Sequence, residues 1–278
     1  MSGPDAPAPL PHAGGGRLLD LSRIVSRLGR GPMTGIDRVE LTYLQTLLAG
    51  DRPLHALVRT APGYCLLDRD GTAQLAALAA GERPLPEHPD ILSRLTRRGD
   101  RLRARAETAV RRLSSARATA GGLGRLLARL PGPLAYVNTG HANLSGRMFA
   151  ALRARADSRA IVMIHDVIPL DHPEYTRPGQ DARFARMIAH VSAGADLVIY
   201  NSAATRARAE PRLAAFGRIP PGIVAHLGTT LVAPDAGRLP ADLDLARPYF
   251  VVLGTIEPRK NHALLLDVWE QLARSRLA

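Results

Sequence analysis

The chain has 278 residues, of which 46% are hydrophobic and 22% are charged, and its formal net charge is +12. This composition is typical of a globular protein with room for one sizeable domain and part of another. There is no run of about 18 uncharged apolar residues, which excludes a transmembrane helix. The single cysteine, Cys65, excludes an internal disulfide and any multi-cysteine metal site. Because residues 1–16 hold neither a basic start nor an apolar core, we expect no secretory signal and a cytoplasmic protein.

The first predicted elements follow a tail rich in Pro, Gly and Ala, residues 1–16, which we expect to be disordered. The apolar runs and breaker residues after it predict, in order, a buried strand over 18–22, a glycine-bearing loop over 29–35, a helix over 36–49, strands over 54–59 and 63–67, and a short helix over 72–80. Prolines then make 82–89 a connector, because they fit neither a helix interior nor a central strand.

A basic insertion, residues 90–129, is predicted to be helical. Apolar residues recur every three to four positions from Ile91 to Leu113, so they share one stripe. Five arginines form a basic strip along its flank: Arg94, Arg98, Arg101, Arg105 and Arg112. Such a helix suits an anionic membrane surface or an acceptor, and the alternative is a solvated hairpin that packs on the domain. Nucleic-acid binding would rest on charge alone, because no zinc-finger spacing or aromatic RNA-binding pattern accompanies the arginines, and we predict none.

The rest of the chain alternates strands and helices. The predicted strands are 134–140, 160–166, 196–202 and 222–228, and the helices between them are 143–156, 180–193 and 202–215. Residues 229–247 have no periodic pattern and are interpreted as an interdomain linker, after which a strand (249–255), a loop and a helix open a second unit. This alternation predicts an α/β fold with a parallel sheet covered by helices on both faces.

Ligands of such sheets bind at the carboxyl ends of the strands, so the candidate residues are those that follow predicted strands. The loop over 29–35, with Gly31, Thr34 and Gly35, precedes a helix and can offer backbone N–H groups to an anion. The alternative is a turn in which Thr34 and Asp37 form a capping box.

Two further strand ends carry polar residues. His165 ends the strand 160–166, where its ring can donate a hydrogen bond to a substrate; the alternative is a histidine satisfied by backbone carbonyls. Asp166 begins the following loop. Asn201 and Ser202 end the strand 196–202 and could line the same cleft, although Ser202 is also a good helix N-cap.

A pair of cations, Arg259 and Lys260, lies in the loop of the second unit. Lys260 is the only lysine of the chain. Two adjacent cations at the start of a helix suit a diphosphate, and the alternative is a solvated basic turn.

Together and in this order, these segments resemble the retaining GT-B glycosyltransferases of family 4, also called glycosyltransferases group 1. The most specific segment is YFVVLGTIEPRKNHALLLDVWEQL, which resembles the opening of that family's donor-binding domain. Supporting segments are LLDLSRIVSRLGRGPMTGIDRVE, HDVIPLDHPEY and ADLVIYNSAAT. The resemblance covers residues 17–278.

The resemblance implies two Rossmann-like domains that face a cleft: an acceptor domain over 17–228 and the start of a donor domain over 248–278. It implies transfer of a sugar from a nucleotide-sugar donor to a glycan or lipid-linked acceptor, with retention, in cell-surface polysaccharide biosynthesis, and it implies no metal or other cofactor. His165 would be the catalytic histidine that reaches the transferred sugar. The residues implied to bind the donor diphosphate are Arg259, Lys260, Gly31, Thr34 and Gly35.

The donor domain of that family continues well beyond this length and contains a pair of glutamates that this chain lacks. We therefore expect these 278 residues to be a fragment that is inactive by itself. The alternative is a non-catalytic or split acceptor-domain protein that binds glycan, anionic lipid or a partner subunit. The basic strip is compatible with a peripheral position on the inner face of the plasma membrane.

Overall fold

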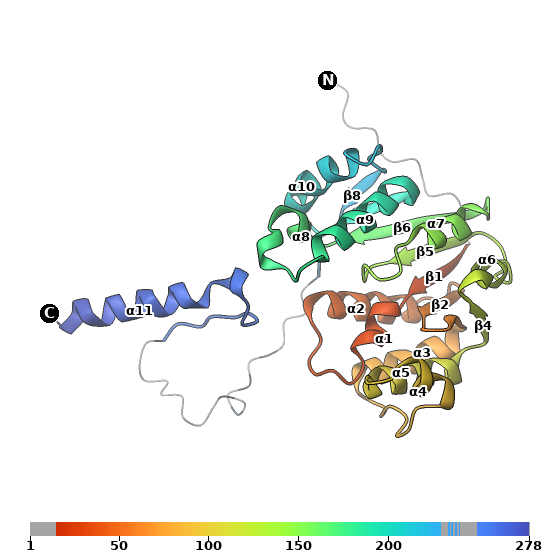
Figure 1. Ribbon diagram of the computed structural model, residues 1–278, viewed down its shortest axis with the longest axis horizontal. Coiled ribbons are helices and arrows are strands. Elements are labelled where there is room, and N and C mark those ends of the chain that lie inside the picture. The colour runs from red at the N-terminus through yellow and green to blue at the C-terminus, as the bar shows by residue number, and fades with distance from the viewer. Residues whose placement is uncertain are drawn as a thin grey trace.

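The computed structural model describes residues 15–228, 233, 235, 237, 239 and 249–277. Within these ranges the chain forms an α/β fold around an eight-stranded sheet, with helices on both faces (Figure 1). The predicted tail lies outside the described residues except for its last two positions, and Gly16 already begins the first strand. The predicted linker over 229–247 lies almost entirely outside them.

The sheet has the strand order β4-β3-β2-β1-β5-β6-β7-β8. Its strands are β1 (Gly16–Asp20), β2 (Leu54–Arg59), β3 (Gly63–Leu67), β4 (Ala116–Thr119), β5 (Leu134–Asn138), β6 (Ser158–Ile164), β7 (Leu197–Tyr200) and β8 (Gly222–Val224). The six neighbouring strands β2, β1, β5, β6, β7 and β8 pair parallel to one another. The strand β3 pairs antiparallel with both β2 and β4. The mostly parallel sheet confirms the predicted Rossmann-like α/β class.

Two sets of helices cover the two faces of the sheet. One set consists of α6 (Leu123–Leu127), α7 (Gly146–Arg153), α9 (Gln180–Gly194) and α10 (Ala203–Ala214). The other set consists of α1 (Ser22–Arg27), α2 (Gly35–Ala49), α3 (Arg69–Ala80) and α5 (Arg101–Leu113). Each set buries its own mainly aliphatic core cluster against the sheet. Among the described residues, no helix combines the length and the apolar character needed to cross a bilayer.

The basic insertion differs from the prediction in two respects. It contains α4 (Ile91–Thr96) and α5 separated by a break, because Gly99 is left-handed (φ 82°) and Asp100 caps α5 by accepting a hydrogen bond from the Arg103 N–H at 3.0 Å. The prediction of a single apolar stripe is therefore wrong, because Ile91 is 70% exposed whereas Val110 on α5 is buried. The insertion also contains β4, which pairs with β3 where a helix was expected.

The predicted strand over 249–255 is not a strand in the structure. A strand needs a neighbour for its backbone N–H and C=O groups, and no described residues pair with this segment. The helix predicted after it is present as α11 (His262–Leu277), preceded by a single 3-10 turn over Pro258–Lys260.

Candidate functional site

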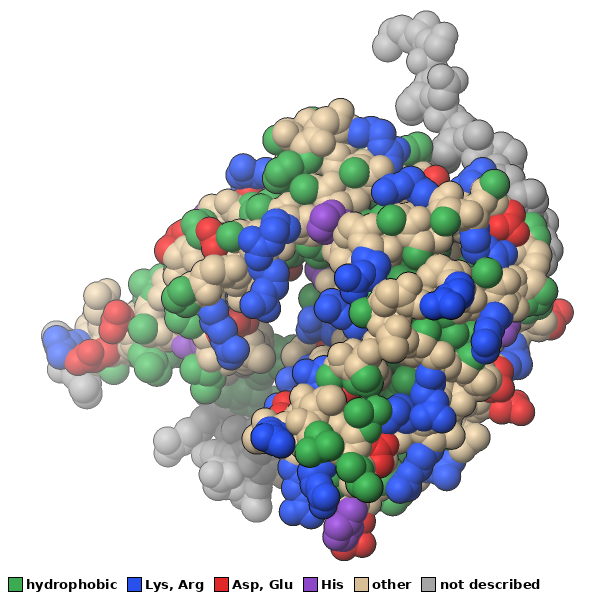
Figure 2. Space-filling model, turned by 45° about the vertical axis from the view of Figure 1, so that its right-hand side comes forward, with side chains coloured by type: hydrophobic (Ala, Val, Ile, Leu, Met, Phe, Trp, Pro, Cys, Tyr) green, Lys and Arg blue, Asp and Glu red, His purple; other side chains and the backbone are tan. Residues whose placement is uncertain are grey.

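The order of the strands places a crevice at the carboxyl end of β1. The chain passes from β1 to β2 on one side and returns to β5 on the other, and such a switch point leaves a gap between the loops that follow the two central strands. Two cavities open there, of about 800 Å³ and about 620 Å³, and both are lined by Arg23 and His141. We call the larger one the cleft. Arginine side chains gather around a hollow on the face shown in Figure 2.

The cleft brings together residues from both predicted units. Arg23 follows β1, His141 follows β5 and Asp166 follows β6, while Arg259 comes from the turn before α11. Asp166 accepts a hydrogen bond from the N–H of Ile168 at 3.1 Å, which fixes the start of α8 (Ile168–Asp171).

The loop after β5 is the most unusual backbone at this edge. His141 and Asn143 have φ values of 60° and 61°, in the left-handed region that residues with a side chain rarely adopt. Asn138 holds the loop, because its Oδ1 accepts from the His141 N–H at 3.1 Å and its Nδ2 donates to the Ala142 carbonyl at 2.7 Å. Strained backbone of this kind concentrates at functional sites.

A buried carboxylate anchors the same loop from β1. Asp20 accepts hydrogen bonds from Asn143 Nδ2 at 2.8 Å and from the Tyr136 hydroxyl at 2.9 Å. Burial raises the pKa of Asp20, although these hydrogen bonds oppose the shift. The network ties the ends of β1 and β5 together.

A second carboxyl, Glu40 on α2, lies against Gly140. Glu40 is fully buried, and its carboxylate oxygens lack hydrogen-bond partners of ordinary length among the residues that the structure describes. Burial, followed by the charge of Asp20, raises the pKa of Glu40 well above its ordinary value. A Cβ atom at position 140 would lie 2.9 Å from Glu40 Oε2, so the close approach of this helix requires glycine there.

Two histidines meet behind the cleft, with ring centroids 5.1 Å apart. His165 Nε2 donates to the Thr139 carbonyl at 2.7 Å, and His141 Nε2 donates to the Met163 carbonyl at 2.9 Å. Burial lowers the pKa of both rings, that of His141 to about 3. Both are therefore neutral near pH 7, with the proton on Nε2 because a carbonyl oxygen can only accept.

The position of His165 matches the structural alternative more closely than the catalytic one. Its side chain is 7% exposed and bound to a backbone carbonyl, and it lines neither cavity. Its contact with the transferred sugar stays a prediction. His141, which the sequence analysis did not single out, lines both cavities.

The residues at and after the end of β7 hold the backbone of His165 in place. Asn201 Nδ2 donates to the His165 carbonyl at 2.9 Å, and Thr205 Oγ1 donates to the same carbonyl at 3.3 Å. Ser202 Oγ accepts from the Thr205 N–H at 3.0 Å, which confirms Ser202 as the N-cap of α10. Neither Asn201 nor Ser202 lines the cleft.

The glycine loop touches the cleft indirectly. Thr34 donates from its N–H and its hydroxyl to Asp37 Oδ2 at 2.8 and 2.7 Å, so the capping arrangement is present. Asp37 also pairs with Arg23 at 2.8 Å, which links the loop to a residue that lines the cleft. Gly31 and Gly35 line neither cavity, and a Cβ atom on either would meet nothing within 4 Å.

The basic pair is divided between two environments. Arg259 lines the cleft and pairs with Glu257 at 2.6 Å, whereas Lys260 is exposed and lies outside the cleft lining. Binding of a diphosphate by this pair stays a prediction.

The predicted basic strip is also divided. Arg94, Arg98 and Arg101 are exposed and line a shallow cavity of about 540 Å³ beside α4, and Arg112 is exposed on α5. Arg105 instead donates to the carbonyl oxygens of Pro86 and Leu85, at 2.5 and 3.3 Å, and so holds the connector.

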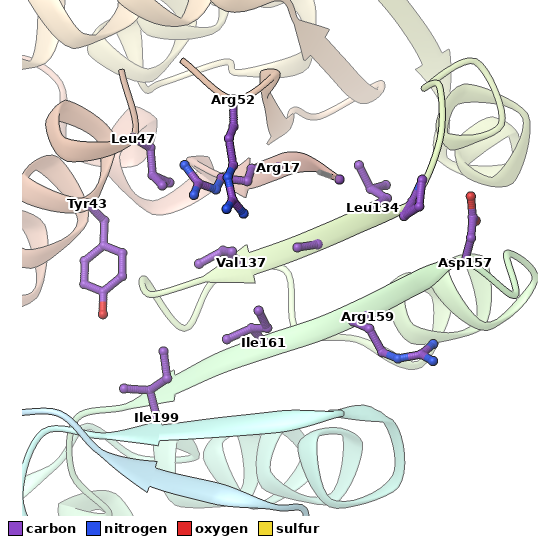
Figure 3. Close-up of a pocket in the computed structure, with 13 residues that line it drawn as sticks. Arg17, Tyr43, Leu47, Arg52, Leu134, Val137, Asp157, Arg159, Ile161 and Ile199 are labelled. Carbon is purple, nitrogen blue, oxygen red and sulfur yellow. The ribbon is translucent and has the colours of Figure 1, made fainter. Parts of the chain in front are cut away.

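A further cavity, of about 320 Å³, lies between α2 and the face of the sheet (Figure 3). Tyr43, Leu47, Val137, Ile161 and Ile199 give it a mainly apolar wall. It occupies a side of the sheet rather than the edge where the strands end, and none of the predicted site residues lines it.

Comparison with known proteins finds similarity to mannosyltransferases. The chain is similar to the serotype-specific mannosyltransferase WbdA of Escherichia coli, with 28% identity over 151 residues, which is 48% of this chain and 18% of that protein. Another WbdA sequence from the same species is 29% identical over 130 residues, 42% of this chain and 16% of the relative. The chain thus spans less than a fifth of these curated relatives. No family model matches it, and no solved structure matches it.

Proposed function

We propose that the chain is part of a glycosyltransferase that moves a sugar from a nucleotide-sugar donor to a glycan or lipid-linked acceptor in cell-surface polysaccharide biosynthesis. The observation that carries the proposal is the cleft of about 800 Å³ at the carboxyl edge, which is lined by Arg23, His141 and Asp166 and also by Arg259 from the second unit. The similarity to a mannosyltransferase supports it and makes mannose the first sugar to test.

The cleft has the charges that this chemistry needs. When the sugar leaves its nucleotide, negative charge grows on the diphosphate while the anomeric carbon becomes oxocarbenium-like. Arg23 and Arg259, with Lys260 nearby in sequence, would offset the charge on the leaving group. In the retaining mechanism that we propose, the acceptor hydroxyl attacks from the face that the diphosphate leaves and gives its proton to a phosphate oxygen. We propose that this transfer needs no metal ion.

The two neutral histidines would orient the sugar. In neutral His141 only Nδ1 is left to accept, because Nε2 donates to Met163, so it can receive a hydrogen bond from a sugar hydroxyl. We propose that His165 acts on the sugar through the loop that both rings support, or reaches it directly when the donor is bound.

Binding of the donor is the most direct test, because it can be measured without an acceptor. Nucleotide sugars with different bases and sugars, GDP-mannose among them, would be screened by calorimetry and by their effect on the melting temperature. We expect Lys260→Ala to weaken the binding of both the intact donor and the free nucleoside diphosphate about tenfold. His165→Ala should weaken the binding of the intact donor only.

The control is Arg125→Gln, because Arg125 is an exposed arginine on α6 that lines none of the cavities described above. Its donor affinity should equal that of the wild type. If no nucleotide sugar binds, or if all three variants bind alike, the proposed function is wrong.

A second candidate is the binding of an anionic lipid surface through α4. The observation that favours it is the apolar group Ile91, Leu92 and Leu95, exposed by 70%, 45% and 53%, beside exposed Arg94 and Arg98. Sedimentation with liposomes should increase with the fraction of anionic lipid and decrease with salt. Equal sedimentation with neutral liposomes would contradict this candidate.

A further inference from the structure

Four arginines line the cavity of about 620 Å³ beside the cleft: Arg23, Arg59, Arg97 and Arg103. We call this cavity the arginine pocket. It lies where β1, β2 and β5 end, so it occupies the switch point itself. Its volume is in the range of sites for small ligands.

The charges in the arginine pocket are unbalanced. Arg97 and Arg103 share one carboxylate, that of fully buried Glu107, at 2.7 and 3.0 Å. Arg23 pairs with Asp37. Arg59 is exposed and forms no ion pair with any described residue. Among the described residues, the four cations therefore form ion pairs with only two carboxylates, and the neutral ring of His141 adds no charge.

The pocket is also built rather than accidental. The backbone N–H of Arg59 donates to Ser22 Oγ at 2.9 Å, and its carbonyl accepts from Arg103 Nη2 at 3.3 Å, so two other lining residues fix its position. Arg103 is only 12% exposed, and no described residue forms a hydrogen bond with its buried Nη1. A buried unpaired donor needs an acceptor, which a ligand or a water molecule could supply.

We propose that the arginine pocket binds a phosphate or carboxylate group carried by the acceptor glycan. Guanidinium groups are suited to these anions, because their planar donors match two oxygens at once. The pocket shares Arg23 and His141 with the cleft, so an anion held in it places a neighbouring acceptor hydroxyl toward the transferred sugar. The word acceptor rests on the proposed function, whereas binding of the anion does not.

Calorimetry at constant ionic strength tests the proposal with three probes: inorganic phosphate, glucuronate and neutral mannose. We expect the anionic probes to bind and mannose not to bind. Arg59→Gln should weaken the binding of the anionic probes about tenfold, because it removes one charge-assisted contact. Ala61→Glu, which adds a carboxylate to the pocket lining, should weaken their binding at least as much. Arg125→Gln should leave the affinity unchanged, and circular dichroism of each variant would confirm its fold.

The two anionic probes separate the sources of the charge. Tighter binding of phosphate assigns the pocket to a phosphorylated acceptor, and tighter binding of glucuronate assigns it to an acidic sugar. If mannose binds as well as either anion, or if Arg59→Gln and Ala61→Glu both bind like the wild type, the proposal is overturned.

Lys260→Ala separates this proposal from the donor site. If that variant loses phosphate binding while Arg59→Gln keeps it, the anion lies in the donor site and the arginine pocket proposal fails, whereas the proposed function stands. If Arg59→Gln alone loses it and no nucleotide sugar binds, the pocket stands and the proposed function fails.

Discussion

Replacing Glu107 with glutamine tests how the arginine pocket is held together. Glu107 is fully buried, and its Oε1 accepts hydrogen bonds from Arg97 and Arg103 while its Oε2 accepts from the Ala61 N–H at 3.2 Å. Removing one partner of a buried ion pair costs about 3–5 kcal/mol. Arg97 is 33% exposed and can regain water, and glutamine keeps one acceptor oxygen, so we expect about 3 kcal/mol. For a domain of this size that lowers the melting temperature by about 6–12 °C.

Urea unfolding followed by circular dichroism measures this loss. Glu82→Gln is the matched control, because Glu82 is exposed and forms no ion pair with a described residue, and its change should stay within about 0.5 kcal/mol. A double-mutant cycle with Arg97→Gln should show that the second substitution costs less once Glu107 is gone. If Glu107→Gln loses less than about 1 kcal/mol, the buried carboxylate does not hold the arginines in place and the reasoning is refuted.

Three further predictions concern buried groups. Because the pKa of Glu40 is raised in the folded state, the folded state loses stability as the pH rises above about 4.5. Glu40→Gln should therefore increase the free energy of unfolding near pH 7 and make it depend less on pH, as measured by urea titrations. An unchanged pH dependence would contradict this prediction. Gly140→Ala should destabilise by about 1–3 kcal/mol through overlap with Glu40, whereas Gly124→Ala, which meets no atom within 4 Å, should not destabilise the fold. Burial raises the pKa of the Cys65 thiol to about 11, so an alkylating reagent at pH 8 should label it only when the protein unfolds, and rapid labelling of the folded protein would show that the thiol is accessible.

The sequence pattern predicted the elements that have a strong apolar signal. The strands β1, β5, β6 and β7 are buried runs of aliphatic residues and were expected within a few positions. The elements that escaped prediction include β4 and α1. β4 reads Ala-Arg-Ala-Thr, which has low β-propensity and becomes a strand only because β3 offers it an edge. α1 has six residues, too few to show a period. Conversely, the apolar run over 249–255 has strand propensity, but no described residue pairs with it.

The site was predictable where it depends on local rules. The cap of α10 by Ser202 and the contact between Thr34 and Asp37 follow from short-range spacing, and both are present. Arg23 and His141 were missed because their meeting depends on β1 lying beside β5, a fact of strand order that no local pattern contains. The run NTGHAN, which begins at the last residue of β5, offered a signal, since five of its six positions are polar or glycine.

The two outer strands of the sheet have a consequence for association between molecules. β4 has four residues and β8 has three, so each side exposes few unpaired backbone groups to a second chain. An outward arginine, Arg117, lies on the first, and Pro221, which lacks an N–H, directly precedes the second. Lateral growth by strand addition is therefore disfavoured at both sides, and concentrated solutions of this domain should resist fibril formation.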